Sequence, residues 1–255
     1  MRAEEEIREI FTLTKNLLQA HQDTGLGPPP LPADLLAHLE VDESTTKVPG
    51  LESVSGRDEN IGPPARFASM EALKAHIGDC RRCKLHGGRT NLVFGEGSPR
   101  ARLVFVGEGP GHDEDLTGRP FVGESGGLLT KIIENGMCLT REEVYICNIV
   151  KCHPTRNRNP EKDEIEACLP FLKHQLRIIG PEVICCLGRV AGQALLGADF
   201  SVSRERGKWH SYGDIPLMPT YHPAYLLRNA SAKRQVWEDI KKIMKKMGLE
   251  TKKDG

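Results

Sequence analysis

The chain has 255 residues, a length that fits one large domain or a domain with an appendage. Its 35 basic and 35 acidic residues give a formal net charge of zero, so a nucleic-acid partner would need the basic residues concentrated on one face. No run of about 18 apolar residues is present and the first residues are acidic, so neither a transmembrane helix nor a secretory signal is expected. We therefore expect a cytoplasmic protein without membrane association. In that reducing compartment the eight cysteines serve metal binding or burial, because structural disulfides are rare there.

The first 65 residues are expected to lie outside the main folded domain. Residues 1–22 predict a short amphipathic helix, because apolar side chains recur at helical spacing: Ile7, Ile10, Phe11, Leu17 and Leu18. Residues 23–65 contain seven prolines and five glycines, which predicts a flexible linker. The folded domain is expected over residues 66–249, followed by a polar tail over residues 250–255.

Within the folded domain, short apolar segments alternate with amphipathic segments. Strands are expected over residues 102–106, 144–150, 183–187 and 215–221. Helices are expected over residues 124–137, 161–179 and 189–196, and at the C-terminus with Val236, Ile240, Ile243, Met244 and Met247 on one face. This alternation predicts an α/β fold with a parallel sheet covered by helices on both faces. Ligands of such folds bind at the carboxyl ends of the strands.

Four cysteines form a candidate metal site. Cys80 and Cys83 make a C-x2-C pair before the first strand, and Cys152 and Cys168 lie near the end of the second strand and on the next helix. Four thiolates satisfy either zinc or an iron–sulfur cluster, and the spacing does not choose between them. Cys168 also fits a plain core position on the apolar stripe of its helix. Cysteines inside apolar strands are interpreted as core residues: Cys147, Cys185 and Cys186.

A glycine-rich loop with acidic residues, GEGPGHDED, follows the first strand at residues 107–115. Its G-x-G-x-G spacing does not match the dinucleotide-binding motif. Four carboxylates would repel a pyrophosphate there: Glu108, Asp113, Glu114 and Asp115. The loop suits a neutral ligand, a cationic transition state or a metal ion, and a solvated turn is the alternative.

Three further side chains lie where a ligand site is expected. Phe121 is either a stacking platform for a base or a core residue. The amide of Asn148 matches the N3–H and O4 edge of uracil and mismatches cytosine, unless it is a buried structural amide. His222 opens the loop after the fourth strand, and Leu226, Leu227 and Arg228 then supply an apolar wedge beside a cation, which suits minor-groove insertion or simply starts a helix.

Taken together, the motifs GEGPG-HDED, GRPFVGESG, NIVKC and HPAYLLR resemble the family 4 uracil-DNA glycosylases, in order between about Cys80 and Leu249. The resemblance implies a three-layer α/β/α sandwich around a central four-stranded parallel sheet. It implies a base-excision-repair enzyme that hydrolyses the N-glycosidic bond of uracil in single- or double-stranded DNA and leaves an abasic site. It also implies a [4Fe-4S] cluster on Cys80, Cys83, Cys152 and Cys168, and we expect a monomer.

The resemblance assigns catalysis to Glu108 and His222, with His222 facing uracil O2. It assigns uracil binding to Gly107, Gly109, Glu114, Phe121, Asn148 and His222. Within this set Glu114 resembles the side chain that crowds uracil C5 and rejects thymine, Phe121 the stacking ring and Asn148 the reader of the uracil edge. Gly109 stands where the family usually has alanine, and little effect is expected. The assigned DNA contacts are Leu226, Leu227 and Arg228.

Two other classes of protein remain compatible with the residues alone. The acidic loop suits a metal-dependent nuclease that binds Mg²⁺. The four cysteines suit a zinc-stabilised DNA-binding module without enzymatic activity.

Overall fold

The computed structural model describes residues 67–250. The helix expected over residues 1–22, the linker over residues 23–65 and the tail after residue 250 lie outside the described residues. In residues 67–250, none of the helices combines the length and the apolar character that crossing a membrane requires.

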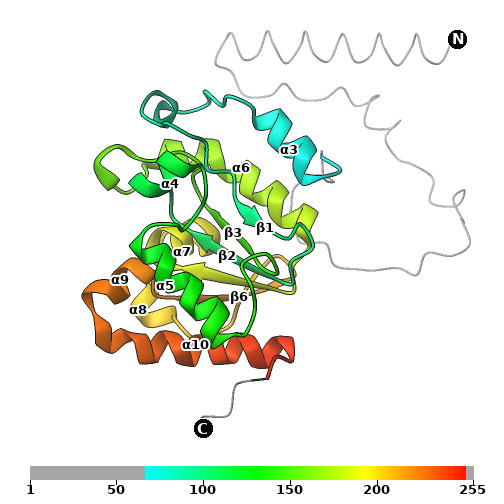
Figure 1. The fold of residues 1–255 in the computed structure, drawn as a ribbon, viewed down its shortest axis with the longest axis vertical. Coiled ribbons are helices and arrows are strands. Elements are labelled where there is room, and N and C mark those ends of the chain that lie inside the picture. Colours follow the sequence, from blue (N-terminus) through cyan, green and yellow to red (C-terminus); the bar gives the residue numbers. More distant parts are fainter. Residues whose placement is uncertain (1–66, 251–255) are drawn as a thin grey trace, which may run out of the picture. The chain divides into compact units, whose positions relative to one another are not determined.

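Six strands form one sheet in the order β1-β3-β2-β4-β6-β5 (Figure 1). The four central strands are β3 (Tyr145–Asn148), β2 (Leu103–Gly107), β4 (Val183–Leu187) and β6 (Ile215–Thr220). They are parallel, with Val106 opposite Cys147 and Val104 opposite Ile184. Strands buried on both faces need continuous apolar runs, which is why these segments were recognisable in the sequence. The predicted four-stranded parallel sheet is confirmed.

Two short antiparallel edge strands extend this sheet beyond the prediction. They are β1 (Glu96–Gly97), which pairs with β3, and β5 (His210–Tyr212), which pairs with β6. Strands of two and three residues carry no detectable apolar alternation, so nothing in the sequence marked them.

Helices cover both faces of the sheet. They are α3 (Met70–Ile77), α4 (His112–Thr117), α5 (Glu124–Lys131), α6 (Lys162–Ile179), α7 (Gly188–Leu196), α8 (Val202–Glu205), α9 (Pro223–Arg228) and α10 (Lys233–Met247). Val104 and Val106 point into the core under α3 and α6, whereas Leu103 and Phe105 point into the core under α5 and α10. Because successive side chains of a strand face opposite sides, each strand supplies both cores. This arrangement confirms the predicted three-layer sandwich.

Several helices differ in extent from the prediction. The helix expected over residues 124–137 ends at Lys131 and continues as a π-helical turn, Ile132–Gly136. The acidic half of the loop at residues 107–115 is helical, because α4 begins at His112. The short helices α3 and α8 were not expected, since neither exceeds eight residues, whereas α9 realises the helix that was one alternative for the segment after His222.

The start of α6 is held by a fully buried carboxylate. Glu164 accepts a hydrogen bond from the Glu161 amide (2.7 Å) and two from the Arg158 guanidinium (2.6 and 2.8 Å). The carboxylate thus caps the helix and connects it to the loop that follows β3.

We expect Glu164→Gln to lower the free energy of unfolding by about 1–3 kcal/mol, because the buried charge-assisted bonds are lost. Glu166→Gln on the same helix is the matched control, since that side chain is 63% exposed. Urea-induced unfolding of both variants tests this expectation. Equal destabilisation by the two substitutions would contradict it.

Candidate active site

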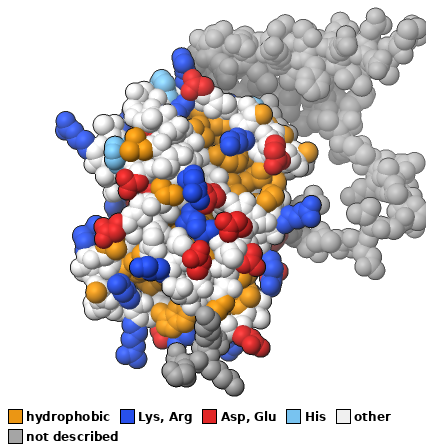
Figure 2. All heavy atoms as spheres, in the orientation of Figure 1, with side chains coloured by type: hydrophobic (Ala, Val, Ile, Leu, Met, Phe, Trp, Pro, Cys, Tyr) orange, Lys and Arg blue, Asp and Glu red, His pale blue; other side chains and the backbone are white. Residues whose placement is uncertain are grey.

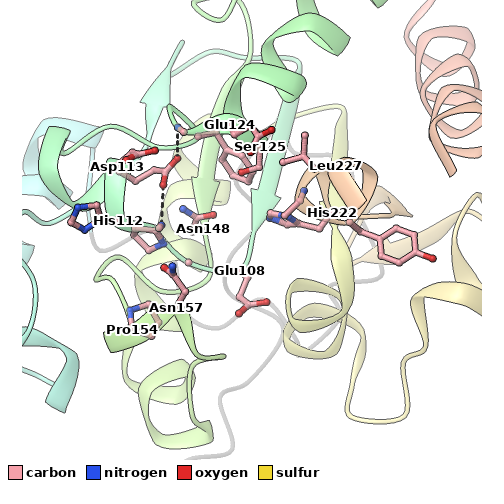
Figure 3. Close-up of a pocket in the computed structure, with 18 of the residues that line it drawn as sticks. Glu108, His112, Asp113, Glu124, Ser125, Asn148, Pro154, Asn157, His222 and Leu227 are labelled. Atoms are coloured by element: carbon pink, nitrogen blue, oxygen red, sulfur yellow. Dashed lines mark hydrogen bonds between the residues drawn. The ribbon is translucent and has the colours of Figure 1, made fainter. Parts of the chain in front are cut away.

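A cavity of about 560 Å³ opens at the carboxyl ends of β2, β3 and β6 (Figure 3). Parallel strands end at the same edge of a sheet, so residues far apart in the chain meet there. Eight of the predicted site residues line this cavity: Glu108, Gly109, Glu114, Phe121, Asn148, His222, Leu227 and Arg228.

Gly107 allows two of these side chains to approach the end of β2. A Cβ atom at this position would lie 2.4 Å from Asn148 Oδ1 and 2.5 Å from Phe121 Cζ. Either contact is a steric clash, so the ring and the amide can occupy these places only beside a glycine. Gly109 is similarly confined, because its Cβ would lie 2.8 Å from Val150 Cγ2. An alanine at this position would require the Val150 side chain to shift.

The Phe121 ring packs against the imidazole of His222, with ring centroids 5.5 Å apart and planes tilted by 31°. The Phe121 backbone has φ of 53°, a left-handed conformation that costs energy for a residue with a Cβ. Only 5% of this residue is exposed. The ring therefore forms a fixed wall of the cavity.

Two charged residues hold the backbone of this strained segment. The Glu114 carboxylate accepts hydrogen bonds from the amides of Gly111, Val122 and Gly123, at 2.8–3.0 Å. On the other side, the Arg141 guanidinium donates to the carbonyl oxygens of Pro120 (2.8 Å) and Phe121 (3.1 Å). These bonds offset the strain and fix the direction of the ring.

Asn148 contributes an amide without a protein partner. The residue is 1% exposed, and in the described part of the chain its Oδ1 atom has no hydrogen-bond donor. A buried polar atom left unpaired is costly, so it points to a bound ligand. Figure 3 shows this amide beside the opening that the His222 ring also faces.

His222 is held in a defined tautomer. Its Nδ1 atom accepts a hydrogen bond from the Ala224 amide (3.2 Å), so the proton of the neutral ring is assigned to Nε2. The pKa of His222 is lowered to about 4, chiefly by burial; Glu114 opposes this shift and Arg228 adds to it. The ring is therefore neutral near pH 7 and offers an Nε2–H donor. A Cβ at Gly188 would lie 2.9 Å from the His222 Cβ, so α7 begins directly behind the imidazole.

Glu108 is a partly buried carboxylate on the same cavity. Burial raises the pKa of Glu108, and the nearby Arg189 opposes this effect. With its amide oriented to satisfy both neighbours, Asn159 donates to Glu108 Oε1 (3.2 Å) and accepts from Arg189 Nη2 (2.8 Å). Glu108 is thus oriented by an amide and remains free to face a ligand.

The acidic loop does not form a metal-binding cluster. Glu114 is saturated by backbone amides, and Asp115 accepts from the Thr90 and Asn91 amides at 2.9–3.3 Å. Among residues 67–250, no three His, Cys, Asp or Glu side chains lie close enough together to hold one metal ion. Two of the four carboxylates that suggested a magnesium-dependent nuclease, Glu114 and Asp115, therefore hold the backbone instead.

The structure separates the two leucines of the expected wedge. Leu226 is 1% exposed and packs in the core under α10, so it does not face a partner, contrary to the expectation. Leu227 is 41% exposed at the cavity rim, next to Arg228. Adjacent residues of a helix point about 100° apart, so both cannot face outward.

Tyr225 lies at the same rim and is 39% exposed; its ring centroid lies 4.7 Å from that of Tyr221, with the two ring planes tilted by 31°. Sequence reasoning missed this residue, although an aromatic three positions after His222 was a visible signal. On the face shown in Figure 2, basic and acidic side chains of the described residues are interspersed. That face does not carry a concentrated basic patch.

The four predicted ligand cysteines line one small second cavity, with Arg82, Arg89 and Lys151. Arg82 donates to Cys80 Sγ (3.4 Å) and Arg89 to Cys152 Sγ (3.3 Å). Burial raises the pKa of Cys168 to about 11. All four thiols are free, whereas Cys147, Cys185 and Cys186 are buried strand residues, as expected.

Comparisons with known proteins agree with this geometry. A family model described as the uracil DNA glycosylase superfamily matches residues 94–241. The chain is 46% identical over 183 residues to a type-4 uracil-DNA glycosylase of Sulfurisphaera tokodaii, covering 69% of this chain and 83% of that protein. It is 48% identical over 178 residues to a type-4 uracil-DNA glycosylase of Thermotoga maritima, covering 68% of this chain and 92% of that protein. A type-5 uracil-DNA glycosylase of Thermus thermophilus is 33% identical over 140 residues, 49% of this chain and 63% of that protein. The chain therefore belongs to the uracil-DNA glycosylase superfamily and, within it, to the type-4 uracil-DNA glycosylases.

Proposed function

We propose that the 560 Å³ cavity binds a uracil extruded from DNA and that the enzyme hydrolyses its N-glycosidic bond, leaving an abasic site for base excision repair. The observation that carries this proposal is the meeting of three different groups at one sheet edge. They are the carboxylate of Glu108, the neutral imidazole of His222 and the unpartnered amide of Asn148. Chemistry on a base requires that base to leave the stack, and a cavity of this kind receives it.

Recognition of uracil rests on Asn148 and Phe121. The Asn148 Oδ1 atom would accept from uracil N3–H, and its amide nitrogen would donate to O4. The buried Oδ1 atom would thereby gain the hydrogen-bond donor that the protein does not provide. The base would stack on the Phe121 ring. Glu114 remains our candidate for crowding C5 and rejecting thymine, because three backbone amides prevent its carboxylate from moving aside.

Cleavage places negative charge on the departing uracil and positive charge on the deoxyribose. We assign the first charge to His222, whose Nε2–H would donate to uracil O2 without a proton being transferred. Glu108 would stabilise the sugar cation or position the attacking water. Both groups are oriented before the substrate arrives, so little reorganisation is needed in the transition state.

The substrate is uracil-containing DNA, single- or double-stranded. Leu227 and Tyr225, both exposed at the rim, would fill the gap left by the extruded base, and Arg228 would contact a phosphate. Leu226 supports α9 from the core. We further propose that the protein acts as a monomer in the cytoplasm, where reducing conditions keep its cysteines available for metal binding.

We assign a [4Fe-4S] cluster to Cys80, Cys83, Cys152 and Cys168. These cysteines share one cavity, the donor set is entirely sulfur, and arginines bonded to two of the sulfurs would offset thiolate charge. Each iron of such a cluster takes one thiolate, so the four sulfurs need not lie as close together as the ligands of a single metal ion. When bound, the cluster would cross-link the turn before β1, the end of β3 and α6. No step of the hydrolysis is assigned to it.

We expect His222→Ala and Glu108→Ala each to lower the single-turnover rate of uracil release by about 100- to 1,000-fold, because each removes a preorganised stabilising group. The abasic product is quantified by strand cleavage in alkali. DNA binding and the iron content should stay unchanged. His210→Ala on β5 is the control, since that side chain does not line the cavity. Wild-type rates in both cavity variants would remove this assignment.

The pH dependence follows from the same two groups. Because the pKa of His222 is lowered to about 4, the rate should show no inflection near the usual histidine value. Because the pKa of Glu108 is raised by burial, the rate should fall on acidification through a value above 4.5 as the carboxylate is protonated. Single-turnover rates between pH 4.5 and 8.5 (about four pH units) measure this dependence. An inflection near ~6.5 that disappears in His222→Asn would refute the neutral imidazole.

Asn148→Asp should lower uracil release by about 100-fold or more and make release of cytosine detectable. The carboxylate has acceptors only, so it loses the donor to uracil O4 and can accept from the amino group of cytosine. Asn157→Asp is the matched control, since Asn157 lines the same cavity but its Oδ1 is engaged by His153 (2.8 Å). Base release from paired uracil- and cytosine-containing oligonucleotides is compared. Unchanged discrimination in Asn148→Asp would contradict the assignment of the base-reading amide.

A further inference from the structure

Lys151 is a fully buried cation between the two cavities. It follows β3 at the cavity that holds the four cysteines and is 1% exposed. Its ammonium group donates to the Asn148 carbonyl oxygen (2.8 Å) and to Gln175 Oε1 (2.6 Å), both neutral acceptors. Across the described residues, no carboxylate pairs with this group. An ammonium group buried without compensation is strongly unfavourable and would lose its proton, so a negative charge nearby would be needed to keep Lys151 charged.

The cysteine cavity is where that charge would be located. Lys151 lines that cavity together with all four predicted ligand cysteines, and Cys152 is the next residue in the chain. Four thiolates around an iron–sulfur cluster carry net negative charge. The same residue therefore lies at the cysteine cavity and contacts the base-reading strand through its side chain.

The position of the ammonium group leaves it little freedom. The Gln175 amide nitrogen donates to the Phe94 carbonyl (2.8 Å) and to the Tyr145 hydroxyl (3.1 Å), which fixes Gln175 Oε1 toward Lys151. The second bond of the ammonium group ends on the Asn148 carbonyl, at the carboxyl end of β3. Any shift of Lys151 would thus be transmitted to the residue that carries the unpartnered amide.

We propose that Lys151 is a positioning residue that couples the cysteine-bound cluster to the uracil pocket, balancing the charge of the cluster and holding Asn148 in place. The proposal rests on the proposed function, because it assumes both the cluster and the role of Asn148. Lys151 does not line the cavity proposed to bind uracil. The negative charge of the cluster would then keep the Lys151 ammonium group in place against the Asn148 carbonyl, in addition to the cross-link that the cluster makes between segments of the chain.

The test compares Lys151→Met, which removes the charge at similar length, with Lys151→Arg, which keeps it. Lys84→Met is the matched control, since Lys84 also adjoins a ligand cysteine but is about half exposed and paired with Glu161. Iron content, the midpoint potential of the cluster, and kcat and KM for uracil release are measured on the full-length holoenzymes.

We expect Lys151→Met to shift the midpoint potential to more negative values, because reduction adds charge where a cation has been removed. Its kcat should fall by about 10- to 100-fold with little change in KM, which is the usual effect of removing a hydrogen-bond partner that orients a functional side chain without touching the ligand. Lys151→Arg and Lys84→Met should keep the wild-type potential. Loss of iron in Lys151→Met alone would also support the proposal.

Three outcomes would overturn it. One is a loaded Lys151→Met enzyme with wild-type potential and kcat. Another is the same shift in Lys84→Met. The third is loss of the cluster from Lys151→Met and Lys151→Arg alike, which would show that only side-chain shape matters. A wild-type protein without iron or uracil release would instead contradict the proposed function itself, so the two failures are distinguishable.

Discussion

The segment around Phe121 is the constraint on which the pocket depends. Its left-handed backbone is unfavourable for a residue with a side chain, and it persists because Glu114 binds its amides while Arg141 binds its carbonyls. Without these two ions the ring would be free to relax away from His222. The Glu114 carboxylate, which the sequence placed among a cluster of acids, therefore serves to hold the backbone, and the orientation of the Phe121 ring depends on it.

Much of this arrangement could be predicted from the chain alone, for a physical reason. Strands buried on both faces require apolar runs, and parallel strands end at one edge, so Gly107, Asn148 and the loop carrying His222 were expected to meet. Their meeting is what the structure shows. The motifs that resemble the family 4 glycosylases added the roles of these residues, which spacing could not supply.

Other features depend on contacts between distant parts of the chain and were not predictable. The partners of Asp115 are amides at Thr90 and Asn91, more than twenty residues away, so an acidic loop could be mistaken for a metal site. Lys151 lies in an apolar motif, and only the folded neighbours Gln175 and Asn148 reveal what its charge contacts. The two edge strands are likewise defined by pairing, not by composition.

The helix α9 spans only six residues, Pro223–Arg228, yet it presents Leu226 to the core and Leu227 to the rim. A single inserted or deleted residue would rotate everything after it by about 100°, which would turn an anchoring side chain outward and a rim side chain inward. Substitutions here change one contact at a time, whereas a change of length rearranges all of them. Natural variation in this helix should therefore alter its residue types far more readily than the number of residues between the imidazole and the arginine.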